Sequence, residues 1–250
     1  MNLLVDIGNT RLKWMLSHPS GHPGQALGRA VNMSYQLDLA WGKLAPPQWV
    51  VVTSVAGAAT EQDLRQWVQR CWPAARVHFV VAAAAGWGVK NSYREPARLG
   101  SDRWAALIAA RHLTQAPVCV VDCGTAVTLD ALNAAGEFVG GVILPGIALA
   151  RQSLRLGVAG IAETEGDDTS CFARATTDAV AAGTFYGLVG AVERIVTELG
   201  AGLGKDTQVL LTGGDGLRLM PYLQGRVAYP MRPVPDLVLQ GLARIAESLV

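Results

Sequence analysis

Two short apolar strands, each followed at once by an Asp-x-Gly turn, constrain this 250-residue chain more than any other feature. Leu3-Leu4-Val5 leads into Asp6-Ile7-Gly8-Asn9-Thr10, and residues 118–121 lead into Asp122-Cys123-Gly124-Thr125-Ala126, nearly half the chain later. After both motifs the sequence predicts a strand, a turn and a return strand. The pattern indicates two halves that open in the same way; the alternative is a chance similarity of short β segments.

Strands and helices are predicted to alternate along both halves. Strands are expected at 11–16, 25–31, 49–55, 77–81, 127–132, 138–144 and 208–211, turns at 17–24 and 133–137, and helices at 62–71, 103–113 and 177–199. Pro46-Pro47 and Pro230 to Pro235 are expected to form loops. Strands interleaved with helices are typical of an α/β fold with mixed sheets. We therefore predict two domains, 1–115 and 116–250.

Composition argues against several other classes of protein. Only 16% of the residues are charged and the formal net charge is +1, which disfavours disorder and gives no overall basic field for nucleic acid. Asp6 interrupts the apolar N-terminus, and the longest apolar stretches fall far short of the roughly 20 residues that span a bilayer. The four cysteines include no C-x-x-C pair and are expected to be buried, reduced thiols. We expect a cytoplasmic protein that binds neither nucleic acid nor membrane.

An Asp-x-Gly turn after a buried strand has the chemistry of a phosphate site. Glycine lets the backbone approach a phosphate closely, and backbone N–H groups and a threonine hydroxyl can donate to its oxygens. The aspartate would repel phosphate, so its natural partner is a cation that bridges to the phosphate. A single turn of this kind is common in proteins. Two of them, facing each other across a cleft, would form a two-sided phosphate clamp.

A third glycine turn follows the predicted strand at 208–211. Gly213-Gly214 could let an adenine or ribose lie flat against the backbone, although a plain strand-to-helix turn explains the pair equally well. Residues 200–206 resemble a Walker A loop, but the glycine spacing is one residue short and Asp206 replaces the serine or threonine. Neither a P-loop nor a Rossmann motif is present.

Taken together, these motifs resemble those of the actin/sugar-kinase/Hsp70 superfamily. Within it, the sequence is similar to the type III pantothenate kinases through Asn91-Ser92-Tyr93 with Pro96, through Leu99 to Arg103, and through Gly140 to Gly146. Ser101 departs from the family pattern, which more often has alanine. The resemblance implies two actin-like (ribonuclease H-like) domains, with mixed β-sheets flanked by helices and an ATP cleft between them.

The activity that the resemblance implies is ATP-dependent phosphorylation of pantothenate to 4′-phosphopantothenate, the first step of coenzyme A biosynthesis. It also implies a homodimer in which the neighbouring subunit contributes to the pantothenate pocket. The implied ATP contacts, with Asp6 near Mg²⁺, are Asp6, Ile7, Gly8, Asn9, Thr10, Arg11, Leu12, Lys13 and Thr125. The implied pantothenate contacts are Tyr93, Gly100, Ser101, Asp102, Arg103 and Thr176, with Thr177 as the alternative to Thr176. Asp102 matches a proton acceptor, and Asp122 matches the ligand of a monovalent cation, K⁺ or NH₄⁺.

The chemistry of these residue types is compatible with the implied roles. Arg103 offers a planar fork that can grip a carboxylate, Asp102 can accept the proton of a hydroxyl, and Lys13 can meet a phosphate. Simpler interpretations stay open for each residue. Ser101 or Asp102 could be the N-cap of the following helix, Arg103 a surface ion-pair partner, Tyr93 a core aromatic with a solvated hydroxyl, and Lys13 a solvated strand residue.

Two other functions are compatible with the same resemblance. One is a regulatory accessory factor of the family without kinase activity, and the other is an actin-like kinase for a different small hydroxylated substrate. The set of Asp6, Asp102 and Asp122 favours an enzyme, because a regulator does not need three carboxylates in a cleft. The segment from Tyr93 to Arg103 favours pantothenate over another substrate.

Overall fold

The computed structural model describes residues 1–17, 27–28, 33–161 and 166–249, and the chain divides into two compact units. Unit 1 comprises residues 1–113, 136–138 and 236–250, and unit 2 comprises residues 114–135 and 139–235. The chain first passes from unit 1 to unit 2 after residue 113, close to the expected domain boundary at residue 115. The expected second domain differs from unit 2 at its C-terminal end, because residues 236–250 belong to unit 1.

Close packing of two helices explains this difference. Helix α7 (Leu237–Glu247) lies against α3 (Ser101–Leu113) in unit 1. At the crossing, Gly241 approaches the backbone of Ala105 so closely that a Cβ atom could not fit. The sequence contains no obvious signal for such a contact between residues this far apart.

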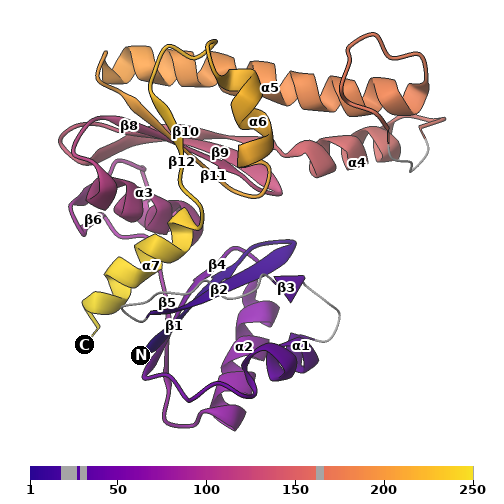
Figure 1. Cartoon of the computed structure of the whole chain (residues 1–250). Coiled ribbons are helices and arrows are strands. Elements are labelled where there is room, and N and C mark those ends of the chain that lie inside the picture. The colour runs from indigo at the N-terminus through magenta and orange to yellow at the C-terminus, as the bar shows by residue number, and fades with distance from the viewer. Residues whose placement is uncertain (18–26, 29–32, 162–165, 250) are drawn as a thin grey trace. The chain divides into compact units, whose positions relative to one another are not determined.

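Unit 1 is built on a five-stranded sheet with the order β3-β2-β1-β4-β5 (Figure 1). The strands are β1 (Asn2–Ile7), β2 (Arg11–Ser17), β3 (Leu27–Gly28), β4 (Trp49–Ser54) and β5 (Arg76–Phe79). Strand β1 is antiparallel to β2 and parallel to β4. Side chains such as Val5 and Val52 pack with those of α1 (Met33–Trp41) and α2 (Ala58–Cys71), while α3 and α7 also pack against the sheet.

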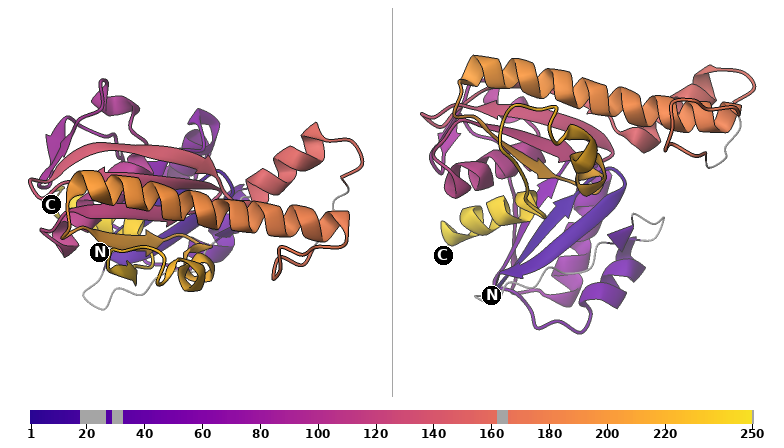
Figure 2. Two further views of the ribbon diagram at one scale, coloured as in Figure 1. Left: turned by 90° about the horizontal axis from the view of Figure 1, so that it is seen from above. Right: turned by 45° about the horizontal axis from the view of Figure 1, so that its top comes forward.

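Unit 2 contains the strands β8 (Val118–Cys123), β9 (Ala126–Leu132), β11 (Gln208–Thr212), β12 (Met231–Pro233) and most of β10 (Glu137–Pro145). Their order is β12-β11-β8-β9-β10. The helices are α4 (Ile147–Gly157), α5 (Thr176–Leu203) and α6 (Gly216–Leu223), and α5 runs along the sheet (Figure 2). In unit 1, the first residues of β10 pair with β7 (Val89–Asn91), which pairs with β6 (Ala85–Gly86).

The internal repeat predicted from the sequence is confirmed. In each unit the strand that carries the motif aspartate has its hairpin partner on one side and a parallel strand on the other: β2-β1-β4 in unit 1 and β9-β8-β11 in unit 2. The register also matches, because Asp6 pairs with Thr53 and Asp122 pairs with Thr212.

Most predicted elements are found within a few residues of their expected ends, with two kinds of exception. The turn at 17–24 and the strand at 25–31 fall largely outside the described residues, apart from Ser17 and β3. The expected loop from Pro230 to Pro235 is wrong, since Met231–Pro233 forms β12. This strand lies at the edge of the sheet, where a proline removes no essential ladder hydrogen bond.

Helix α5 is long and apolar enough to cross a membrane by length and composition, with a mean hydropathy of 1.3 over its best window. The sequence search for unbroken apolar runs missed it, because glycines and threonines interrupt the run. Phe185, Val189, Val192 and Val196 of this helix pack into the core of unit 2. The apolar face therefore has a role within the fold itself.

The cysteines are all free thiols, as expected, but only two are buried. Cys119 and Cys123 lie in β8, and burial raises the pKa of each thiol to about 12. Cys71 and Cys171 are exposed, which corrects the expectation of four buried thiols.

Candidate functional site

The first Asp-x-Gly motif forms a tight hairpin turn between β1 and β2. The Gly8 N–H donates to the Arg11 carbonyl oxygen over 2.9 Å, and a Cβ atom on Gly8 would lie 3.2 Å from that oxygen. Asn9, Thr10 and Arg11 are exposed at the turn. Ile7 and Leu12 are buried in the core of unit 1, so only their backbone could contact a nucleotide.

Two polar side chains lie beside Asp6 on the strands that neighbour β1. Lys13 on β2 pairs directly with Asp6 and is half-buried rather than fully solvated. Thr53 on β4 pairs with Asp6 from the other side, and its hydroxyl donates to Asp6 Oδ1 over 3.0 Å. Directly paired residues project to the same face of a sheet, so the three side chains share one face.

The second Asp-x-Gly motif forms the corresponding turn between β8 and β9 in unit 2. The Gly124 N–H donates to the Ala126 carbonyl oxygen over 3.1 Å, and Thr125 is exposed. Gly213, at the end of β11, has a φ of +85°, and a Cβ atom there would lie 2.5 Å from Asp122 Oδ1. Glycine is therefore needed at residue 213 for a steric reason.

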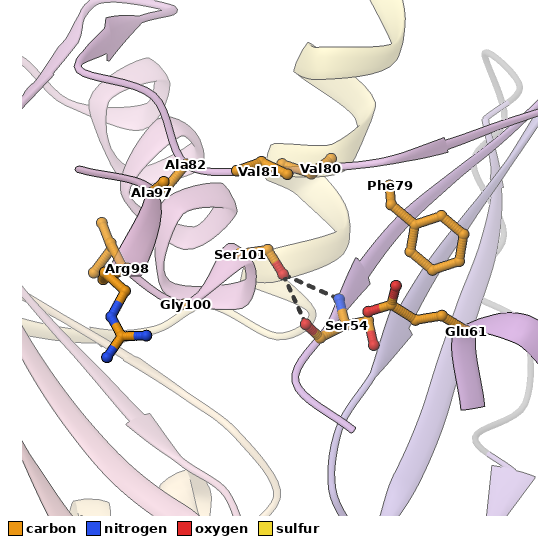
Figure 3. Close-up of a pocket in the computed structure, with 11 residues that line it drawn as sticks. Ser54, Glu61, Phe79, Val80, Val81, Ala82, Ala97, Arg98, Gly100 and Ser101 are labelled. Carbon is orange, nitrogen blue, oxygen red and sulfur yellow. Dashed lines mark hydrogen bonds between the residues drawn. The ribbon is translucent and has the colours of Figure 1, made fainter. Parts of the chain in front are cut away.

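The start of α3 is joined to the end of β4 by the hydroxyl of Ser101. Its Oγ accepts the Ser54 N–H over 3.0 Å and donates to the Ser54 carbonyl oxygen over 3.2 Å (Figure 3). The Ser101 side chain bonds to β4, whereas Asp102 Oδ1 accepts the Arg103 N–H over 2.7 Å at the first turn of the helix. Because α3 begins at Ser101, both N-cap candidates lie in its first turn, and of the two only Asp102 accepts a backbone N–H there, that of the next residue.

The Asp102 carboxyl group lies in a desolvated position. Burial raises its pKa above the ordinary value, and the hydrogen bond from the Arg103 amide and the positive charge of Arg103 oppose that shift. Burial is the largest of these effects because a charged carboxylate loses its hydration when water is excluded. A raised pKa brings a carboxylate closer to the range in which it works as a general base.

Arg103 is buried, with 7% of its surface exposed, so the surface ion-pair alternative is wrong. Its Nη1 donates to the Tyr93 hydroxyl oxygen over 2.8 Å, which also corrects the expectation of a merely solvated hydroxyl. The guanidinium group lies 5.6 Å from the Tyr93 ring centroid and 5.8 Å from that of Phe138. Such cation–π contacts stabilise a guanidinium that has left water.

Asn91 holds the loop that carries Tyr93, a role that sequence reasoning missed. Its Nδ2 donates to the carbonyl oxygens of Ala83 and Pro96, and its Oδ1 accepts the Tyr93 N–H. An asparagine that bonds to the backbone two residues later is a recognised turn former, which is a signal that the sequence did contain.

A cavity of about 400 Å³ opens in unit 1 beside Gly100 and Ser101 (Figure 3). It is lined by the apolar residues at 79–82, by Ala97 and Leu99, and by the charged residues Glu61 and Arg98. This volume lies in the range of small-molecule pockets.

The remaining predicted site residues belong to unit 2. Thr176 is exposed at the first residue of α5, and Thr177 beside it is partly buried. The backbone of Thr177 lies against Gly166, where a Cβ atom would not fit. These facts leave Thr176 as the more accessible of the two threonines.

The residues present fit a magnesium ion that is shared with a nucleotide. Among the described residues there is no cluster of three or more His, Cys, Asp or Glu side chains. Mg²⁺ bound with ATP needs only one or two carboxylates, because phosphates and water supply its other ligands. Asp6, at the end of β1 beside a glycine turn, meets that requirement.

Comparison with known proteins shows to which family this chain is similar. The family model for type III pantothenate kinase matches residues 2–198. The type III pantothenate kinase of Nitrosococcus oceani is 38% identical over 257 aligned positions, covering 99% of this chain and 94% of that protein.

Two solved structures are similar over nearly the whole chain. One is a Campylobacter jejuni protein described as a Baf family transcriptional activator, with a TM-score of 0.58, 22% identity, and coverage of 99% and 98% of the two chains. The other is a Sinorhizobium meliloti protein described as a 2-dehydro-3-deoxygalactonokinase, with a TM-score of 0.58, 16% identity, and coverage of 100% and 99%. At these identities the likeness shows the fold alone, and the fold is the expected actin-like one.

The environment of Asp102 predicts a pH-dependent effect on stability. Because its pKa is raised in the folded state, ionisation of Asp102 opposes folding at neutral pH, and this penalty disappears below the ordinary carboxyl pKa of about 3.9. The Asp102→Asn variant should therefore have a larger free energy of unfolding than the wild type at neutral pH. Urea unfolding of both proteins should show the difference shrinking as the pH falls toward that value. A variant less stable than the wild type at neutral pH would contradict this account.

Proposed function

Because the chain belongs to the type III pantothenate kinase family, we propose that it transfers the γ-phosphoryl group of ATP to the primary hydroxyl of pantothenate, forming 4′-phosphopantothenate for coenzyme A biosynthesis. The observation that carries the proposal is the meeting of Asp102, Arg103 and Tyr93 at the start of α3. These residues supply a partly buried carboxylate and a planar cation held by a phenol. They suit a substrate that has both a reacting hydroxyl and a carboxylate.

Asp102 accepts the proton of the attacking pantothenate hydroxyl in this mechanism. Its raised pKa favours proton acceptance, and its position at the first turn of α3 is fixed by the Arg103 amide. In the loose transition state of phosphoryl transfer the nucleophile is only weakly deprotonated, so orientation of the hydroxyl contributes more than basicity.

Arg103 binds the pantothenate carboxylate, with Tyr93 and Gly100 beside it. The bond from Nη1 to the Tyr93 hydroxyl and the two aromatic rings hold the guanidinium plane in one orientation. A pre-oriented planar fork loses little entropy when it binds a carboxylate. The cavity beside Gly100 and Ser101 provides room for part of the substrate. Thr176 is a further substrate contact in this proposal.

In this proposal each glycine turn offers contacts for the phosphates of ATP. The first turn, from Asp6 to Lys13, offers backbone N–H groups, the Thr10 hydroxyl and the Lys13 ammonium, and Thr125 is the contact from the second turn. Asp6 binds the Mg²⁺ that accompanies ATP, and that ion supplies neutralisation of phosphate charge when it is bound. Asp122 binds K⁺ or NH₄⁺.

We further propose that the protein is a cytoplasmic homodimer. Support comes from the family resemblance and from exposed apolar side chains in unit 2, notably Leu156, Val158 and Phe172. Sedimentation equilibrium of the purified protein would distinguish a dimer from a monomer.

The Asp102→Asn substitution tests the catalytic assignment. The variant should bind both substrates but turn over roughly 10²–10⁴ times more slowly, the usual effect of removing a positioned general base. Steady-state kinetics with varied pantothenate and ATP would measure the change in kcat and in each KM. Turnover close to that of the wild type would reduce Asp102 to a helix-capping residue.

Replacing Arg103 by lysine tests the assignment of the carboxylate site. Arg103→Lys keeps the charge but loses the bidentate fork and the bond to Tyr93, so the KM for pantothenate should rise while the KM for ATP changes little. Tyr93→Phe, which removes only the hydroxyl, should produce a smaller change in the same direction. If ATP affinity falls instead, Arg103 has been placed on the wrong ligand.

A potassium titration tests the role of Asp122. Two unit charges about 4 Å apart interact by about 4 kcal/mol at an effective dielectric near 20, so a carboxylate beside a triphosphate needs a compensating cation. Activity at saturating Mg²⁺ and fixed ionic strength should be low in sodium and rise with potassium, and Asp122→Asn should blunt that rise. A flat wild-type titration would exclude the monovalent-cation role.

A further inference from the structure

Thr53 is a buried polar residue placed directly beside the first motif. It lies on β4 in parallel register with Asp6 of β1, and none of its surface is exposed. Strand alternation places both residues on the same face as Leu4 and Val51, opposite to the face of Val5 and Val52 that packs with α1 and α2. The two side chains are therefore neighbours for geometric reasons before any hydrogen bond is considered.

The Thr53 hydroxyl uses its single proton on the Asp6 carboxylate. Oγ1 donates to Asp6 Oδ1 over 3.0 Å. Hydrogen bonds to an ionised acceptor are stronger than those between neutral groups. Threonine is also stiff about χ1, so its hydroxyl direction is well defined. A fixed donor of this kind orients the carboxylate.

The same pairing of residue types recurs in the second half of the chain. Thr212 on β11 pairs in register with Asp122 of β8, and only 5% of its surface is exposed. Apolar residues fill the equivalent buried positions earlier in both strands, including Val51 and Leu210. Because a threonine lies beside the motif aspartate in both halves, we attribute its presence to the motif and not to the packing of the sheet.

We propose that Thr53 is a positioning residue that orients the Asp6 carboxylate for the magnesium ion of MgATP. The inference rests on the proposed function, which places Asp6 at that ion. The next residue, Ser54, is bonded through its backbone to Ser101 at the start of α3. The end of β4 therefore holds both the phosphate turn and the helix that carries Asp102.

Thr53→Val tests the proposal, because it removes the hydroxyl while nearly preserving side-chain volume, and Thr53→Ser retains the hydroxyl. The measurements are kcat as a function of Mg²⁺ and calorimetric binding of a non-hydrolysable ATP analogue with and without Mg²⁺. Loss of a residue that orients a metal ligand typically costs 10–100-fold in metal affinity or activity. The valine variant should show a shift of that size in both Mg²⁺-dependent readouts and unchanged analogue binding without Mg²⁺, and the serine variant should resemble the wild type.

A second matched pair covers the case in which valine impairs folding. Thr53→Ala and Thr53→Ser are similar in volume and differ mainly in the hydroxyl, and thermal unfolding of each reports any structural damage. A valine or alanine variant that is folded and has wild-type Mg²⁺ dependence would overturn the proposal. If the wild type does not phosphorylate pantothenate, the proposed function fails, but Mg²⁺-dependent analogue binding still decides the role of Thr53.

Discussion

The hydrogen bonds at the carboxyl end of β4 are the interaction on which the arrangement of unit 1 depends. Thr53 bonds to Asp6 on one side, and the backbone of Ser54 bonds to Ser101 on the other, each across 47 residues of sequence. Unpaired polar groups at such a position would be costly, because water is largely excluded from the interior of the sheet. The first glycine turn and the start of α3 are therefore anchored to one strand end.

Packing on both faces of the same sheet makes that anchor rigid. Trp41, Trp67 and Trp72 form a cluster of ring contacts on the side of α1 and α2. On α3, Trp104 and Leu107 are fully buried, and Gly241 allows α7 to approach that helix closely. A helix held in this way can keep Asp102 in a desolvated position even though burial opposes its charge. The stability of the core thus maintains the Asp102 carboxylate with a raised pKa.

The fold was largely predictable because its signals are local and repeated. The motif at Asp6 and that at Asp122 predicted two similar openings, and the strand order of each unit agrees. Contacts between distant segments were not predictable from patterns: the C-terminal helix α7 returns to unit 1, and Trp41, Trp67 and Trp72 gather in one core. For the site, residue types indicated Arg103 and Tyr93, but their mutual bond and the bond from Thr53 to Asp6 emerged only from the three-dimensional pairing.

Direct detection of the phosphorylated product tests the central claim most simply. Purified protein would be incubated with ATP, pantothenate, Mg²⁺ and K⁺, and the products identified by mass spectrometry and phosphorus NMR. The account predicts ADP and 4′-phosphopantothenate in equal amounts, with the new phosphate ester on the primary hydroxyl. Formation of ADP without phosphorylated pantothenate, or transfer only to a different hydroxylated acceptor, would contradict it.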